Sequence, residues 1–317
     1  MTNNDTENVE REAEYPSIKY NKSTIDYTSI DAFKVSSKNK NDGNNKMREN
    51  IIGAIINNKI PEKYFTSNRK WKNLKKAILK YLKLQNNKKI DIIKCEHKGG
   101  RQFNFDFLIT ITYDDKSIEI YNIEFKFNAN KIDDAPQFVS PMKPSQYLTK
   151  SYEEYYYDNH LQKIADSANL PIPDKEEYLS KIHNNKPKCM KKFQEKYYKG
   201  CKKSSKFTNN QKDIDFYNFC KEKSKQSISQ FIEKTDLNKE LLSTYLQESQ
   251  NNKIYMLYYN KKITSQCVNM DDYQIQTVTK NPKLNRYDCI TKSGKKMKVL
   301  LRWKNGNSIA FPSLQIS

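Results

Sequence analysis

The sequence predicts an α/β protein in which helices flank a mixed β-sheet, a helical insertion interrupts the sheet and a β-rich part follows. Apolar residues recur at helical spacing from about residue 46 to residue 85, and shorter apolar runs with strand periodicity come next. Helical patterns then dominate from about 150 to 251, before strand patterns return at residue 253. Because sheet patterns stand on both sides of the helical stretch, we expect the helices to be inserted into the sheet domain.

The predicted division of the chain follows these changes in pattern. Residues 1–44 are polar, which predicts a disordered arm. Residues 45–149 and 252–317 form the expected core together with its β-rich C-terminal part, and residues 150–251 form the basic helical insertion. Within the core, apolar runs bounded by polar turns predict strands at three places: about 90–95, 103–112 and 118–127.

The helix expected at about 67–85 has one apolar face and several basic ones. Trp71, Leu74 and Ile78 recur at helical spacing and should face the core. Its other faces carry seven cations and no acidic residue: Arg69, Lys70, Lys72, Lys75, Lys76, Lys80 and Lys83. Neighbouring like charges on a helix repel each other. The pattern therefore favours a phosphate-bearing partner over an ordinary solvated face, with Lys72, Lys76 and Lys80 as candidate contacts.

The helical insertion contains the most basic stretch of the chain. Residues 186–206 hold nine lysines and one acid, with Phe193, Tyr197 and Tyr198 among them. Lysines that contact phosphates beside aromatics that stack on bases are typical of a nucleic-acid surface. The candidate contacts here are Lys191, Lys192, Lys196, Lys199, Lys202 and Lys203. The aromatic residues are equally compatible with the core of a small helical domain.

The composition of the whole chain points in the same direction. The 317 residues include 57 Lys and Arg against 37 Asp and Glu, a net charge of +20, which attracts polyanions such as DNA. The chain is rich in Lys, Asn, Ile and Tyr, which AT-rich codons encode, so genome bias alone can inflate the lysine content. It does not explain why the lysines cluster. The sequence shows no long apolar run and no signal peptide, and its six cysteines are widely spaced. We therefore expect an intracellular protein, in cytoplasm or nucleus, with no membrane partner and no secretion.

Three charged residues on neighbouring predicted strands give the strongest functional signal. Asp106 lies between two phenylalanines on one strand, and Glu124 and Lys126 lie two residues apart on the next. Side chains two apart leave a strand on the same face, so Glu124 and Lys126 should point together toward Asp106. Two carboxylates can hold Mg²⁺, which prefers oxygen ligands, and a nearby lysine can orient water. The alternative is a surface hairpin whose charges face solvent.

This arrangement of Asp106, a hairpin and Glu124-Phe125-Lys126 resembles the PD-(D/E)xK nuclease superfamily, which has the restriction-endonuclease-like fold. The family's proline before the aspartate is replaced here by Phe105. The resemblance implies that Asp106, Glu124 and the main-chain carbonyl of Phe125 bind Mg²⁺, for which Mn²⁺ would substitute, and that Lys126 assists the attacking water. It also implies further polar residues at the site, and the candidates are Glu49 and Gln137. Arg101, in the loop before the aspartate, is a candidate DNA contact.

The function that this resemblance implies is metal-dependent endonucleolytic hydrolysis of DNA, leaving a 5′-phosphate and a 3′-hydroxyl. The large basic insertion favours a sequence-specific enzyme, restriction- or homing-like, that acts on double-stranded DNA, and a homodimer would suit cutting of both strands. Two alternatives stay open. One is a non-catalytic DNA- or RNA-binding protein that uses the hairpin as a scaffold, and the other is a structure-specific repair or recombination nuclease.

Overall fold

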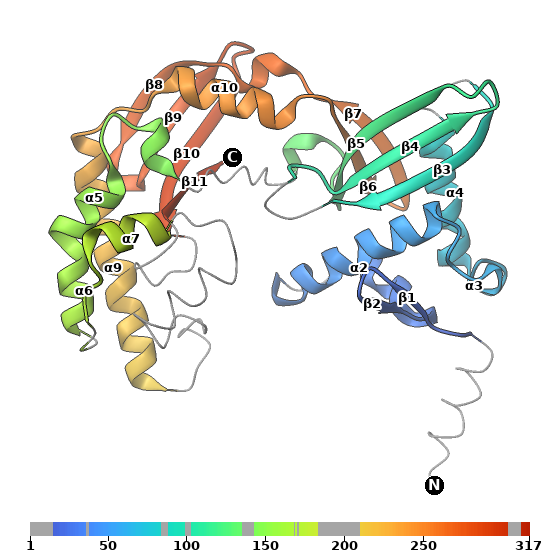
Figure 1. The fold of residues 1–317 in the computed structure, drawn as a ribbon, viewed down its shortest axis with the longest axis horizontal. Coiled ribbons are helices and arrows are strands. Elements are labelled where there is room, and N and C mark those ends of the chain that lie inside the picture. The colour runs from blue at the N-terminus through green and yellow to red at the C-terminus, as the bar shows by residue number, and fades with distance from the viewer. Residues whose placement is uncertain are drawn as a thin grey trace, which may run out of the picture. The chain divides into compact units, whose positions relative to one another are not determined.

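The chain forms two compact units in the computed structural model, and each is described here by itself (Figure 1). Unit 1 combines residues 1–136 with 250–268, and unit 2 combines residues 137–249 with 269–317. The structure describes residues 15–35, 38–83, 88–98, 103–134, 143–167, 169, 171–182, 210–303 and 312–317.

Unit 1 is built on a five-stranded mixed sheet in the order β3-β4-β5-β6-β7. Its strands are β3 (Ile90–His97), β4 (Phe107–Tyr113), β5 (Ile118–Phe127), β6 (Lys253–Tyr259) and β7 (Lys262–Cys267). The first three strands form an antiparallel meander, β5 pairs with β6 in parallel, and β7 returns antiparallel. The parallel step requires a long connection, and here that connection contains most of unit 2. This mixed α/β architecture agrees with the predicted fold class.

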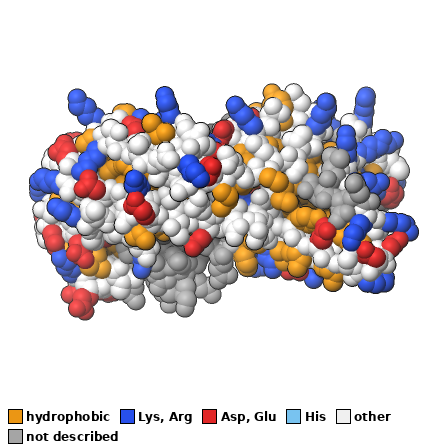
Figure 2. Space-filling view, turned by 90° about the horizontal axis from the view of Figure 1, so that it is seen from above, with side chains coloured by type: hydrophobic (Ala, Val, Ile, Leu, Met, Phe, Trp, Pro, Cys, Tyr) orange, Lys and Arg blue, Asp and Glu red, His pale blue; other side chains and the backbone are white. Residues whose placement is uncertain are grey.

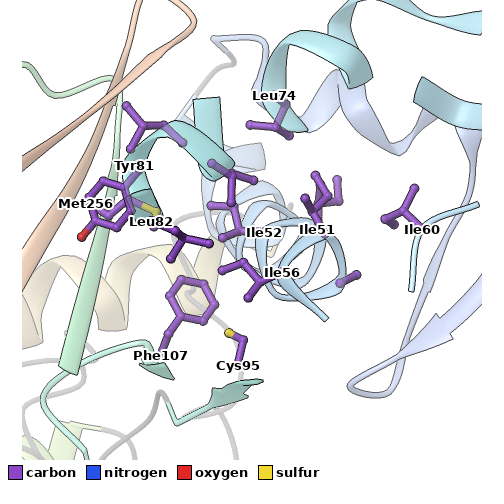
Figure 3. Packing of buried hydrophobic residues seen from close by; sticks show 14 of the residues in the cluster. Ile51, Ile52, Ile56, Ile60, Leu74, Tyr81, Leu82, Cys95, Phe107 and Met256 are labelled. Atoms are coloured by element: carbon purple, nitrogen blue, oxygen red, sulfur yellow. The ribbon is translucent and has the colours of Figure 1, made fainter. Parts of the chain in front are cut away.

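Helices cover one face of this sheet and form the main hydrophobic core with it (Figure 3). They are α2 (Lys38–Ile56), α3 (Glu62–Ser67) and α4 (Arg69–Lys83). In β4 every second residue is buried, beginning with Phe107, whereas the residues between keep some exposure. Ile51, Ile52 and Ile56 of α2 pack against this face, as do Leu74, Tyr81 and Leu82 of α4. The apolar faces that the helical and strand periodicities predict therefore pack together in one core.

The N-terminal segment is more structured than the predicted disordered arm from residue 15 onward. It forms a hairpin of β1 (Ile18–Tyr20) and β2 (Ser23–Ile25), followed by the 3-10 helix η1 (Tyr27–Phe33). Widely spaced apolar residues anchor it, with Ile25 and Ile30 buried in the core. The buried Arg48 of α2 also donates from Nε to the Ala32 carbonyl at 2.6 Å. The prediction of disorder was based on the polar average composition, in which these few buried residues do not stand out.

Helix α2 is joined to the edge strand β3 by Asn57, which follows its last turn. The Asn57 side chain donates to the Cys95 carbonyl and accepts from the Cys95 N–H, both at 2.8 Å. One side-chain amide thus pairs with the strand as a neighbouring backbone would. The helix also lies close to the N-terminal hairpin at Gly53, because a Cβ there would come within 2.7 Å of Tyr20 Oη. These contacts set the position of α2 over the end of the sheet.

Unit 2 combines a four-stranded antiparallel sheet, in the order β11-β10-β9-β8, with a group of helices. The strands are β8 (Ile275–Asn281), β9 (Arg286–Thr291), β10 (Lys296–Trp303) and β11 (Pro312–Ile316). The main helices are α5 (Tyr152–Tyr156), α6 (Gln162–Ser167), α7 (Lys175–Ile182), α9 (Gln211–Glu233) and α10 (Lys239–Gln250). Short 3-10 turns and the π-helical segment η4 (Tyr157–Leu161) connect them. Trp303 of β10 donates from Nε1 to Tyr152 Oη at 2.9 Å, which ties the sheet to α5.

The division into units differs from the predicted one at the C-terminal side. Residues 250–268 belong to unit 1, but residues 269–317 pack with the helices of the inserted part. The reason is that β8–β11 form a sheet of their own and bury Tyr287, Val299 and Leu301 away from the first core. Within the described ranges, no helix has both the length and the apolar character that a membrane span needs.

Candidate active site

Glu124 and Lys126 lie on β5, the central strand of the five-stranded sheet. Their side chains leave the same face of the strand, while Ile123 and Phe125 are buried in the core on the other face. Both charged side chains are largely shielded from solvent, with 15% of Glu124 and 21% of Lys126 exposed. Charged side chains on a hairpin at the protein surface would have much larger exposed fractions.

Asp106 precedes β4 and is held by backbone hydrogen bonds on both sides. Its N–H donates to the Ile123 carbonyl at 2.9 Å, and its carbonyl accepts from the Lys98 N–H at 2.8 Å. Its carboxylate Oδ2 accepts from the Phe125 N–H, also at 2.9 Å. The aspartate is therefore bonded directly to the Glu-x-Lys segment. Because the N–H and C=O of a strand residue point to the same edge, the Phe125 carbonyl also leaves β5 on the side of Asp106.

Two lysines flank the carboxylate of Glu124. Lys126 Nζ forms an ion pair with Glu124 Oε1 on the same strand. Lys253 Nζ, from the neighbouring parallel strand β6, lies 3.9 Å from Glu124 Oε2. Only 6% of the Lys253 side chain is exposed, and this burial lowers the pKa of Lys253 below its usual range. A buried cation is stable only with charged partners, and Glu124 is the principal one here.

A second group of polar residues lies at the same end of the sheet. Glu49 of α2 is in contact with His97, the last residue of β3, at 2.9 Å between Oε2 and Nε2. The other ring nitrogen of His97 faces the Asn21 side-chain amide at 3.2 Å. If the amide nitrogen donates to Nδ1, the neutral ring carries its proton on Nε2 and donates to Glu49. The N-terminal hairpin thus helps to orient a carboxylate beside Asp106.

Asp106 is the most perturbed acid at this site. Burial, followed by the negative charges of Glu124 and Glu49, raises the pKa of Asp106 from 3.8 to about 8. The hydrogen bond from Phe125 and the charge of Lys126 act in the opposite direction but only partly offset these effects. Neighbouring carboxylates in a partly dry environment repel each other. Strongly perturbed acids of this kind are typical of functional sites.

These residues fit a divalent cation of the Mg²⁺ type. Mg²⁺ is usually bound by one or two carboxylates, with water and substrate oxygens completing its shell. Asp106, Glu124 and the Phe125 carbonyl supply three oxygen groups, and a cation would relieve the repulsion that raises the pKa of Asp106. In the described part of the chain, no three His, Cys, Asp or Glu side chains form a ready-made cage. A site of two carboxylates and a carbonyl does not require one.

The structure brings together four of the predicted site residues and leaves others untested. Asp106, Glu124, Lys126 and Glu49 converge at one end of the sheet. Several candidates lie outside the described residues: Arg101, Gln137, Lys191, Lys192, Lys196, Lys199, Lys202 and Lys203.

On α4, the predicted cationic face is partly paired. Lys70 bonds to Asp31 at 3.0 Å and Lys75 to Glu62 at 2.8 Å, because acids from other elements reach the helix. Lys72, Lys76 and Lys80 are exposed, one turn apart, and form no salt bridge within the described ranges. Figure 2 likewise shows basic and acidic side chains interspersed over the visible face. Nucleic-acid binding by these three lysines stays a prediction.

Two residues of the site carried little signal in the sequence. Lys253 begins an apolar strand, and only the parallel register of β5 and β6 places it beside Glu124. His97 ends a strand two residues before a glycine pair, a sequence pattern typical of a surface loop. The contact of His97 with Glu49 depends on where α2 crosses the sheet.

No protein family matches the sequence, and no curated protein is significantly similar to it.

Proposed function

We propose that this protein is a divalent-metal-dependent endonuclease that hydrolyses DNA phosphodiester bonds at the site of Asp106, Glu124 and Lys126. The observation that carries the proposal is the convergence of these side chains at the central strand β5, where Glu124 and Lys126 are largely shielded from water and Asp106 accepts from the Phe125 N–H. If these positions served only the stability of the sheet, we would expect apolar side chains there, because buried like charges are costly. The resemblance to PD-(D/E)xK nucleases supplies the reaction class, and the net charge of +20 favours a polyanionic substrate.

Each residue has a role that its contacts support. Asp106, Glu124 and the Phe125 carbonyl would hold Mg²⁺, which when bound supplies Lewis-acid stabilisation of charge on the phosphate. Lys126, beside Glu124, would orient the attacking water and donate to the phosphate oxygens. Lys253 would hold Glu124 from the neighbouring strand. Glu49, oriented by His97, would add a carboxylate that accepts a hydrogen bond from water or contributes to cation binding.

Plasmid cleavage tests this proposal directly. Supercoiled plasmid is incubated with the wild type, Asp106→Asn and Lys126→Ala, each with Mg²⁺, with Mn²⁺ or with EDTA. We expect metal-dependent nicking or linearisation by the wild type, and a loss of at least a hundredfold in either variant, the range found when one group that stabilises the transition state is removed. Lys116→Ala is the matched control, because Lys116 lies in the exposed turn between β4 and β5 and pairs with Asp91. Cleavage that survives both site substitutions would refute the assignment.

The rival function is non-catalytic nucleic-acid binding. Lys72, Lys76 and Lys80 of α4, which pair with no acid in the described part of the chain, are compatible with it. The same assay separates the two functions when it is combined with a mobility-shift measurement. Binding without cleavage under any of several divalent metals would favour the rival. A strong salt dependence of binding is expected of both functions and does not distinguish them.

A further inference from the structure

Unit 2 contains an open groove that is separate from the carboxylate site. It lies between α9, the 3-10 turn η8 (Pro282–Leu284) and β10, and has a volume of about 720 Å³. All of its described lining belongs to unit 2. The groove is therefore a property of this unit alone.

The rim of the groove is strongly basic. Lys221 and Lys225 of α9, Lys283 of η8 and Arg302 of β10 line it, against one carboxylate, that of Glu222. The three lysines are exposed and form no salt bridge with any described residue.

Several other lysines in unit 2 have acidic partners. Lys280 pairs with Asp236 at 2.8 Å, Lys292 with Asp271 at 3.2 Å, and Lys295 with Asp272 at 3.5 Å. Exposed lysines without an acidic partner among the described residues also occur elsewhere in the unit, for example Lys163, Lys234 and Lys296. The groove differs from these places because four cations line one hollow. Like charges brought together in this way attract an anionic partner.

Arg302 gives the groove a pre-oriented donor group. It stands on a strand, is only partly exposed, and donates from Nη1 to Gln315 Oε1 of the adjacent strand β11. Its Nε is buried and has no hydrogen-bond partner among the described residues. A planar guanidinium held in this way offers donors in the geometry that phosphate oxygens accept.

The floor of the groove is apolar. Ile228, Leu301 and Trp303 lie beneath it with 2%, 1% and 6% exposed, and Leu284 at its side is 51% exposed. A basic rim over an apolar floor suits a ligand that alternates anionic groups with flat apolar faces. The sugar-phosphate backbone and bases of nucleic acid have this character.

We propose that this groove binds a DNA strand, with its phosphates on Lys221, Lys225, Lys283 and Arg302. The choice of DNA rests on the proposed function, whereas the groove and its charge do not. The groove is a holding site and contains no described group that would cleave the strand.

Fluorescence anisotropy with the full chain in EDTA tests this proposal, since no metal-dependent cleavage then interferes. The groove variant is the triple substitution Lys221→Gln, Lys225→Gln and Lys283→Gln. The matched control is Lys280→Gln, Lys292→Gln and Lys295→Gln, which removes the same charge from the same unit at paired positions. Labelled duplex DNA is the probe, with single-stranded DNA and RNA of the same sequence as further arms. Circular dichroism melting checks that both variants fold.

We expect the groove variant to lose at least tenfold in affinity and the control to stay within about threefold. The slope of log affinity against log salt concentration should become shallower by about 0.9 for each duplex phosphate that the groove variant no longer neutralises. Arg302→Lys, which keeps the charge but not the fork geometry, should also weaken binding. Equal losses in both triple variants, or no loss in the groove variant, would overturn the proposal, and a loss seen only with RNA would overturn the choice of DNA. Binding is measured here in EDTA and cleavage is scored separately on plasmid, so failure of the groove and failure of the nuclease proposal remain distinguishable.

Discussion

Replacing Asp106 by Asn should stabilise the metal-free protein while it abolishes cleavage. The substitution keeps an oxygen that can accept from the Phe125 N–H, and it removes a charge held near Glu124 and Glu49. Functional sites commonly carry such local instability, and substitution of the functional residue relieves it. An increase in stability together with a loss of activity is the outcome that a structural aspartate would not produce.

The magnitude follows from the pKa of Asp106, raised from 3.8 to about 8. Each pKa unit corresponds to about 1.4 kcal/mol, so the full shift sets an upper bound of about 6 kcal/mol. Asp106 keeps partial contact with water, and solvent screening reduces this value, so we expect about 2 kcal/mol. Because the folded-state pKa is raised, the stability that protonated Asp106 contributes is fully present below about pH 4. It is lost as the pH rises through about 8.

The assay is urea unfolding of the wild type and Asp106→Asn between pH 5 and pH 9 in EDTA, at about one-unit intervals. The advantage of the variant should grow with pH and level off above about pH 8. Adding Mg²⁺ at about 100 times its Kd should stabilise the wild type by about 2.7 kcal/mol and leave the variant unchanged. Asp91→Asn on β3, whose side chain is more exposed and pairs with Lys116, is the control without this pH trend. A variant that is less stable than the wild type at every pH would refute the reasoning.

Two further substitutions test the contacts that hold the site together. Lys253→Met should lower the free energy of unfolding at neutral pH by about 1–2 kcal/mol, because Glu124 loses one of its two flanking lysines. Lys253→Arg should retain most of the wild-type stability. Urea unfolding measures both variants. Asn57→Ala should cost about 1–3 kcal/mol, because the Cys95 N–H and C=O lose their partners, and it should speed hydrogen exchange of the Cys95 amide. Asn73→Ala on α4 is the control for the second substitution, and equal effects at both asparagines would contradict the bridging role of Asn57.

Local sequence patterns were sufficient to predict most of the elements of unit 1. Strand alternation placed Glu124 and Lys126 on one face of β5, and the structure buries Ile123 and Phe125 on the other. Helical periodicity identified the buried face of α4, including Trp71. These features depend on neighbours two to four residues away, which a sequence displays directly.

The tertiary structure alone decided which distant residues share the site. Lys253 lies beside Glu124 because of the register between two paired parallel strands, between which the chain passes through most of unit 2. Asn21, His97 and Glu49 meet because a hairpin that was predicted to be disordered packs against α2 and β3. The C-terminal strands likewise join the inserted helices rather than the first sheet. The physical reason is the same in each case: periodicity reports which face of an element is apolar, but pairing across long loops is set by the packing of whole faces. The sequence therefore determined the chemistry of Asp106, Glu124 and Lys126, and the fold determined the charges that surround them.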